Sequence, residues 1–247
     1  MTRRIIPCLD VQHGMVVKGV RFAGHQTLGP VADFAARYND ASELVLYDIA
    51  ASPEGRTASA AWVADVAQAI TIPFCVAGGI RTVHDAEALL AAGASKISVN
   101  SPALERPALV RELSEAFGPE RVVVGIDSEQ IAPGDWRVRS HTGSAETTRK
   151  LATKTLDWVQ EVSELGAGEI VLNSMQQDGV RQGYDIAQLQ AVCAVTSVPV
   201  VASGGAGSVN DFVAVFTQTK VQGALAASVF HNGTVRVAEV RAAVEAI

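Results

Sequence analysis

The sequence is poor in cysteine, in aromatic residues and in positive charge, and it has no long hydrophobic run. The three cysteines among 247 residues form no Cys-x-x-Cys pair, and the five histidines show no metal-ligand spacing, so neither a disulfide framework nor a metal site is expected. Lys and Arg number 20 against 26 Asp and Glu, and this net charge of −6 disfavours nucleic-acid binding through a basic surface. No apolar stretch approaches the roughly 20 residues that span a bilayer, and polar Asp10 follows the start too soon for a signal peptide. We therefore expect a cytoplasmic protein that has no cofactor and contacts no membrane.

The sequence is built on a regular alternation of short apolar runs and amphipathic stretches. The expected strands are Ile5–Asp10, Leu44–Asp48, Pro73–Ala77, Lys96–Asn100, Val122–Asp127, Glu169–Asn173, Pro199–Ser203 and Gln222–Ala226. Most of these runs are apolar throughout, which is typical of parallel strands buried on both faces. Eight strands that alternate with eight helices predict an α/β fold, a (β/α)8 TIM barrel, as a single domain over residues 1–247. An open doubly wound sheet is disfavoured because no Gly-x-Gly-x-x-Gly follows the first strand.

A repeat with a period of half the chain supports the barrel. Pro73–Gly79 matches Pro199–Gly205 at an offset of 126 residues, and the capping pairs that follow, Thr82 with Asp85 and Ser208 with Asp211, share that offset. We expect two similar half-barrels, at about 1–118 and 119–247, since so long a period indicates duplication.

Two loops are longer than the spacing requires. Gln12–Pro30 is interrupted by four glycines and is a candidate lid over the barrel mouth, the alternative being an ordinary surface loop. Those glycines are Gly14, Gly19, Gly24 and Gly29. Ser128–Thr148, with Pro133-Gly134-Asp135 between polar alternations, predicts a β-hairpin inserted after the fifth strand.

The strand ends carry the candidate chemistry, because active sites of TIM barrels lie at the C-terminal ends of the strands. Asp10 ends the first strand and Asp127 ends the fifth, on opposite sides of the barrel. Two carboxylates at matching positions indicate a general acid and base, although each alone could simply cap a loop.

Glycine pairs end the third and seventh strands, at Gly78-Gly79 and Gly204-Gly205. Small residues that offer donors follow the fourth and eighth strands, at Asn100-Ser101 and at Ser228. Glycine lets backbone N–H groups approach an anion, so we expect two opposed phosphate sites and a substrate with a phosphate at each end. The alternative, that the glycines only relieve crowding in tight turns, accounts for one site but not for the repeat.

Four charged residues lie at the opposite end, where barrel strands begin: Arg4, Glu43, Lys96 and Glu169. Spacing alone favours a ring of ion pairs that closes the barrel floor.

The sequence resembles the cyclase subunit of imidazole glycerol phosphate synthase, a barrel enzyme of histidine biosynthesis. The resemblance runs from about Arg3 to His231 and rests on Arg4–Asp10, Val17–Gly19, Phe74–Gly79, Val124–Asp127, Gly166–Asn173, Gln177–Asp185 and Ala202–Gly207. It implies that ammonia from a glutaminase subunit enters through the barrel floor, on which that partner docks as a heterodimer. At the mouth, ammonia would react with phosphoribulosyl-formimino-aminoimidazole-carboxamide ribonucleotide to give imidazole glycerol phosphate and aminoimidazole carboxamide ribonucleotide.

The resemblance also implies roles for particular residues. Asp10 and Asp127 would be the catalytic pair, without distinction between acid and base. Arg4, Glu43, Lys96 and Glu169 would form an ammonia gate, which replaces the structural interpretation of the floor. The expected substrate-binding and phosphate-binding residues are Lys18, Asp48, Gly79, Asn100, Ser101, Asp178, Gly179, Gly204, Gly205 and Ser228.

The sequence departs from the family pattern at Ala50, where threonine is usual, at Ser95, where aspartate is usual, and at Pro30 in the lid. Two alternatives stay open. The sister isomerase of the pathway shares the repeat, both aspartates and both phosphate sites, but needs no charged floor. A non-catalytic subunit that only activates a glutaminase would need neither aspartate.

Overall fold

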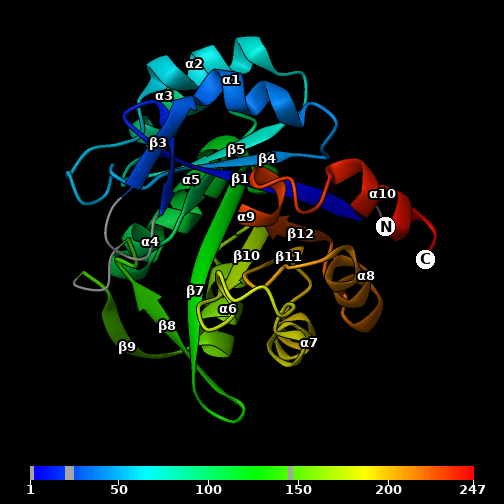
Figure 1. The fold of residues 1–247 in the computed structure, drawn as a ribbon. Coiled ribbons are helices and arrows are strands. Elements are labelled where there is room, and N and C mark those ends of the chain that lie inside the picture. The colour runs from blue at the N-terminus through cyan, green and yellow to red at the C-terminus, as the bar shows by residue number, and fades with distance from the viewer. Residues whose placement is uncertain (1–2, 20–24, 144–146) are drawn as a thin grey trace.

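A closed barrel of parallel strands forms the centre of the computed structural model, which describes residues 3–19, 25–143 and 147–247 (Figure 1). In their order around the barrel, the strands are β1 (Arg4–Gln12), β4 (Leu44–Asp48), β5 (Phe74–Ala77), β6 (Lys96–Val99), β7 (Val122–Ala132), β10 (Glu169–Ser174), β11 (Val200–Ser203) and β12 (Gly223–Ala226). β12 pairs in parallel with β1, with Gly223 opposite Arg4, so the sheet closes on itself. All eight predicted strands are present, and the TIM barrel is confirmed.

Both faces of the barrel strands are buried. The inner face holds a cluster of small and medium apolar side chains: Ile6, Cys8, Val45, Cys75, Val123, Val171, Val201 and Leu225. Residues at the intervening positions, such as Ile5 and Leu9 of β1, pack outward into the larger core beneath the helices. This double burial explains why the strand sequences are apolar throughout rather than alternating.

Helices form the outer layer around the barrel (Figure 1). They are α1 (Val31–Ala35), η1 (Ala36–Tyr38), α2 (Ala60–Ala69), α3 (Val83–Ala91), α4 (Ser101–Glu105), α5 (Ala108–Phe117), η2 (Pro119–Arg121), α6 (Thr155–Glu164), α7 (Ile186–Val195), α8 (Val209–Gln218), α9 (Ser228–His231) and α10 (Val237–Glu245). The segments after β6 and β12 are each divided into two helices, whereas the alternation predicts one. The predicted caps are in place: Asp85 accepts from the Thr82 N–H at 2.9 Å, and Asp211 accepts from the Ser208 N–H at 2.7 Å.

Two antiparallel additions rise from the barrel strands. β7 continues past the barrel and pairs with β8 (Asp135–Ser140), as the inserted hairpin predicts, and β9 (Arg149–Lys154) adds a further strand. After β1, the chain forms β2 (Met15–Gly19) and β3 (His25–Pro30), which pair with each other at the base of the predicted lid. The centre of that lid, including Gly24, lies outside the described residues.

Candidate functional site

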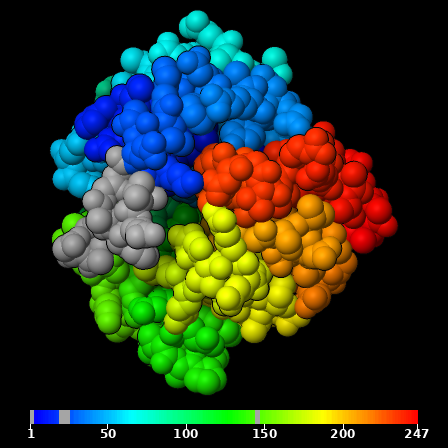
Figure 2. All heavy atoms as spheres, in the orientation of Figure 1, coloured from blue at the N-terminus to red at the C-terminus, as the bar shows by residue number. Residues whose placement is uncertain are grey.

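A cavity of about 730 Å³ opens at the C-terminal ends of the barrel strands. Figure 2 shows the molecule with a hollow near the centre of this face, bordered in part by the yellow segment that leads into α7. All predicted catalytic and substrate-binding residues line this cavity: Asp10, Lys18, Asp48, Gly79, Asn100, Ser101, Asp127, Asp178, Gly179, Gly204, Gly205 and Ser228. Its volume is in the range that accommodates a small-molecule substrate.

Asp127 is held by three side-chain donors. Asn173 Nδ2 donates to its Oδ1 at 2.9 Å, while Asn100 Nδ2 and Thr142 Oγ1 donate to its Oδ2 at 2.8 and 2.6 Å. A carboxylate is an acceptor-only group, so three donors match its charged form and fix its orientation. The Asn100 Oδ1 atom is buried without a partner among the described residues, which leaves one acceptor unused beside Asp127.

Asp10 has a different environment from Asp127. No described side chain donates a hydrogen bond to its carboxylate, and burial together with the nearby Asp178 charge raises its pKa from 3.8 to about 6. The pKa of Asp178 is itself raised, by loss of surrounding water and by the charge of Asp127, although the Gly179 N–H acts in the opposite direction. Two carboxylates with unlike environments in one cavity form an arrangement that separates a proton donor from a proton acceptor.

The two predicted glycine pairs allow close approach of neighbouring backbone. A Cβ added to Gly79 would lie 1.9 Å from the Arg56 carbonyl oxygen, and one added to Gly205 would lie 2.0 Å from that of Gly183. Both glycines also have positive φ, at 66° and 111°. Their absence of a side chain is therefore required by packing as well as by backbone conformation.

Asp48 lines the cavity, but its carboxylate is already occupied. Arg56 binds both oxygens, at 2.8 and 3.1 Å, and the Ala51 N–H donates to Oδ1 at 3.0 Å. Sequence reasoning missed Arg56, because nothing in a spacing of eight residues through an irregular loop indicates a bidentate pair.

The sequence also did not predict two further groups of contacts, which involve Lys18 and His231. Lys18 Nζ of β2 donates to Asn232 Oδ1 at 2.9 Å, just beyond α9. The neighbouring His231 bonds through Nδ1 to the Tyr38 hydroxyl at 2.6 Å and through Nε2 to the Cys8 carbonyl at 2.8 Å. Burial lowers the pKa of His231, and Lys18 adds to that effect while the Cys8 carbonyl opposes it. This histidine connects α9 to the strand that carries Asp10.

The inserted hairpin delivers part of the site. After β8, the chain returns to the mouth, where Thr142 bonds to Asp127 and the His141 N–H donates to Ser101 Oγ at 2.9 Å. The predicted hairpin was the signal that could have located these residues, since a hairpin must return the chain to the strand it leaves.

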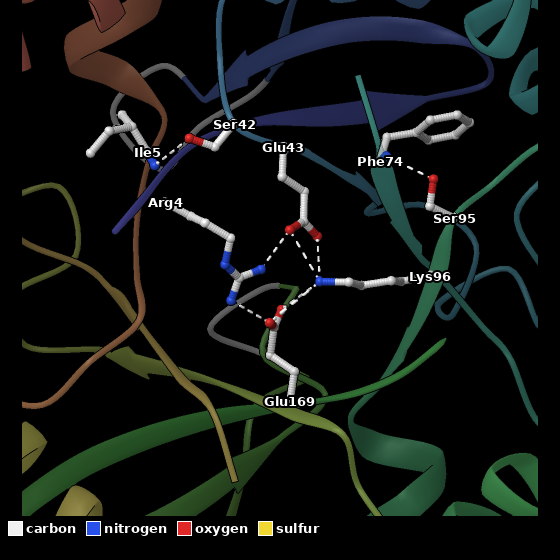
Figure 3. Close-up of polar contacts among 8 residues, drawn as sticks. All are labelled: Arg4, Ile5, Ser42, Glu43, Phe74, Ser95, Lys96 and Glu169. Atoms are coloured by element: carbon white, nitrogen blue, oxygen red, sulfur yellow. Dashed lines mark hydrogen bonds and ion pairs between the residues drawn. The ribbon is translucent and has the colours of Figure 1, made fainter. Parts of the chain in front are cut away.

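The four charged residues of the floor form one alternating ring (Figure 3). Arg4 pairs with Glu43 at 2.6 Å and with Glu169, and Lys96 Nζ lies 3.0 Å from Glu43 and 3.3 Å from Glu169. Burial alone would lower the pKa of Arg4, but the Glu169 and Glu43 carboxylates outweigh it and raise that pKa. Both glutamates are buried, so each needs its cations to offset lost hydration.

Serines next to the ring join neighbouring strands (Figure 3). Ser42 Oγ accepts from the Ile5 N–H at 3.1 Å, and Ser95 Oγ accepts from the Phe74 N–H at 3.3 Å. Ser95, which departs from the family pattern, therefore bonds within the barrel floor.

No group of three or more His, Cys, Asp or Glu side chains in the described ranges is arranged to hold a metal ion. Within the same ranges, every helix is too short or too polar to pass through a bilayer.

Comparisons with known proteins agree with this geometry. A family model described as "Histidine biosynthesis protein" matches residues 4–236. The chain is 58% identical over 243 residues to "Imidazole glycerol phosphate synthase subunit HisF" of Xanthomonas campestris pv. campestris (strain B100), covering 98% of this chain and 94% of the relative. The subunit of the same name from Xylella fastidiosa (strain M12) is 58% identical over 239 residues, covering 96% and 93%.

Proposed function

The chain belongs to the family of HisF subunits of imidazole glycerol phosphate synthase and is a lyase, and from this premise we propose its reaction in detail. It uses ammonia from a glutaminase partner to convert phosphoribulosyl-formimino-aminoimidazole-carboxamide ribonucleotide into imidazole glycerol phosphate and aminoimidazole carboxamide ribonucleotide. The ammonia nitrogen enters the imidazole ring and one water molecule leaves, so the step requires both a proton donor and a proton acceptor.

The single observation that carries this proposal is the contrast between Asp10 and Asp127. Asp10 has a pKa of about 6 and no donor among the described residues, so its surroundings favour the protonated form and leave about a tenth of it protonated at pH 7. A bound substrate with two phosphates would favour that protonated form further. We assign Asp10 as the acid that protonates the departing groups. Asp127, held by three donors, is the base that removes protons from the attacking nitrogen.

The two ends of the cavity suit the two phosphates of the substrate. Gly78 and Gly79 border one end together with Ser101, and Gly204 and Gly205 border the other together with Ser228. Backbone N–H groups at such glycine-rich turns bind phosphate without a basic surface, in agreement with the acidic net charge.

The barrel floor is the proposed entrance for ammonia. The ring of Arg4, Glu43, Lys96 and Glu169 separates the outside from the apolar inner cluster, which leads to the cavity at the mouth. Neutral ammonia crosses such an apolar lining at a lower cost than ammonium, so the ring would admit it only when an ion pair opens. A glutaminase subunit docked on this face as a heterodimer would deliver ammonia directly to the ring.

The proposal is tested by turnover of the bisphosphorylated substrate with ammonium salt and no partner. Wild-type protein should consume substrate, whereas Asp10→Asn and Asp127→Asn should each lose at least about a hundredfold in kcat. Asp40→Asn is the matched control, because Asp40 is exposed and does not line the cavity.

The alternatives predict other results. Interconversion of open and closed ribose forms without ammonia would identify an isomerase. Absence of turnover together with tight binding of a glutaminase would identify a non-catalytic activating subunit. Either outcome would overturn the proposed reaction.

A further inference from the structure

Each glycine pair receives a loop from the preceding βα unit, and each of these loops carries an arginine. The loop after β4 places the Arg56 carbonyl against Gly79, and the loop after β10 places the Gly183 carbonyl against Gly205. Arg181 lies in this second loop, two residues before Gly183. The backbone of the two candidate phosphate sites is therefore arranged in the same way. The arginines of the two loops, Arg56 and Arg181, can be compared directly.

The arginine at the first site is fully engaged in ion pairs. Arg56 contacts both oxygens of Asp48, and its Nε lies 2.6 Å from Glu54 Oε2. Arg56 is also not part of the cavity wall. Its charge is offset before any substrate enters, so it contributes little to binding a phosphate there.

Within the described part of the chain, the arginine at the second site has no such partner. No described carboxylate lies within ion-pair distance of Arg181, which lines the cavity and is exposed. Its backbone is held in place, because a Cβ on Gly207 would lie 2.3 Å from the Arg181 carbonyl oxygen. Arg181 also has a φ of 60°, which is unfavourable for a side-chain-bearing residue and persists only where surrounding contacts impose it.

The remaining charges of the cavity reinforce this difference. Lys18, the other lysine or arginine among the described lining residues, bonds to Asn232 after α9 and so also lies toward the second site. Asp178, in the same loop as Arg181, would repel a phosphate there. A guanidinium group in the same loop would offset that repulsion.

We propose that Arg181 is a cationic ligand for the phosphate bound between the loops after β11 and β12, and that the phosphate at the β5–β6 end is bound without a free cation. This inference rests on the proposed function, because it assumes a substrate with two phosphates. It makes the two sites unequal: one depends on a guanidinium charge and the other on uncharged donors, chiefly backbone N–H groups.

The two products allow the sites to be tested separately, since each carries one phosphate. Calorimetric titration would measure the Kd of imidazole glycerol phosphate and of aminoimidazole carboxamide ribonucleotide for wild type and for Arg181→Gln. Glutamine keeps a polar group that can form hydrogen bonds, but its side chain is shorter and carries no charge. Arg181→Lys tests rescue by charge. Arg111→Gln is the matched control, because Arg111 is exposed on α5 and does not line the cavity.

We expect Arg181→Gln to raise the Kd of one product about tenfold and that of the other less than about twofold, with most of the loss restored by lysine. If the substitution weakened the binding of both products equally, or weakened the binding of neither, the inference would be overturned while the proposed function stayed intact. Failure of the wild-type protein to bind either product would overturn the proposed function itself.

Discussion

Replacing Asp10 with asparagine should stabilise the folded protein while abolishing its activity. The carboxyl group has a pKa of about 6 in the folded chain, against 3.8 ordinarily, so the folded state holds its proton more tightly than the unfolded state. At about 1.4 kcal/mol for each tenfold change in the ionisation constant, this difference corresponds to about 3 kcal/mol of stability lost when Asp10 ionises. Asparagine has nearly the same shape and cannot ionise. We expect the free energy of unfolding of the Asp10→Asn variant to exceed that of wild type by about 2 to 3 kcal/mol at pH 8, which corresponds to a Tm higher by roughly 5 to 10 °C.

The sign of the pH dependence follows from the raised pKa. Below about pH 3.8 the group is protonated in both states and costs nothing, and the cost grows through the interval up to about pH 6 and is complete above it. Urea denaturation at pH 8 and at pH 4.5 should therefore show that only about a third of the gain remains at the lower pH.

Asp85→Asn is a matched control with the opposite sign. Burial alone would raise the pKa of Asp85, but the backbone N–H groups of Arg81 and Thr82 donate hydrogen bonds to its carboxylate and lower that pKa. The ionised form therefore stabilises α3 at neutral pH. The free energy of unfolding of this variant should be about 1 kcal/mol lower than that of wild type at pH 8, and the difference should shrink as the pH falls. An Asp10→Asn protein that is no more stable than wild type at pH 8, or whose gain does not depend on pH, would refute the reasoning.

Three other perturbations have expected outcomes. Arg56→Met should destabilise the fold by about 3 kcal/mol in denaturant unfolding, because it leaves buried Asp48 unpaired, and adding Asp48→Asn should recover most of that loss. Lys96→Met leaves the buried Glu43 and Glu169 carboxylates without their shared lysine, so we expect the floor to rearrange rather than simply to open. Glutamine-dependent turnover should fall at least about tenfold in the assembled complex, with ammonium-dependent turnover within about twofold of wild type. Gly205→Ala should cost more than about 2 kcal/mol by calorimetry, because its Cβ would lie 2.0 Å from the Gly183 carbonyl oxygen.

Much of the fold was predictable because local chemistry and tertiary structure agree. The apolar runs that form β1 and β7 are buried on both faces, and this burial determines their composition. Asp10 and Asp127 could be identified as residues of the barrel mouth, because a carboxylate at the end of such a run is unfavourable in the apolar core and must face the mouth.

The environment of these carboxylates could not be predicted. The donors to Asp127 come from three other segments, at Asn100, Thr142 and Asn173, and their convergence depends on strand register and on the return of the hairpin. The raised pKa of Asp10 depends on burial and on a charge 168 residues away in sequence, at Asp178. Neither effect can be recognised from a local pattern in the amino-acid sequence.

The same limit applies to Asp48 and to the floor. Sequence reasoning placed Asp48 among substrate-binding residues, whereas its oxygens are occupied by Arg56 and the Ala51 N–H. The floor residues were identified by position, and their closed alternating ring depends on the diameter of the barrel. The duplication into two half-barrels stays a prediction from the repeat.

The most direct test of the central claim is to follow the nitrogen. The purified chain would be supplied with the bisphosphorylated substrate and with ammonium labelled with heavy nitrogen, in the absence of a partner. The account predicts label in imidazole glycerol phosphate, none in aminoimidazole carboxamide ribonucleotide, and loss of both products in Asp10→Asn and Asp127→Asn. Consumption of substrate without incorporation of label, or incorporation that survives both substitutions, would contradict it.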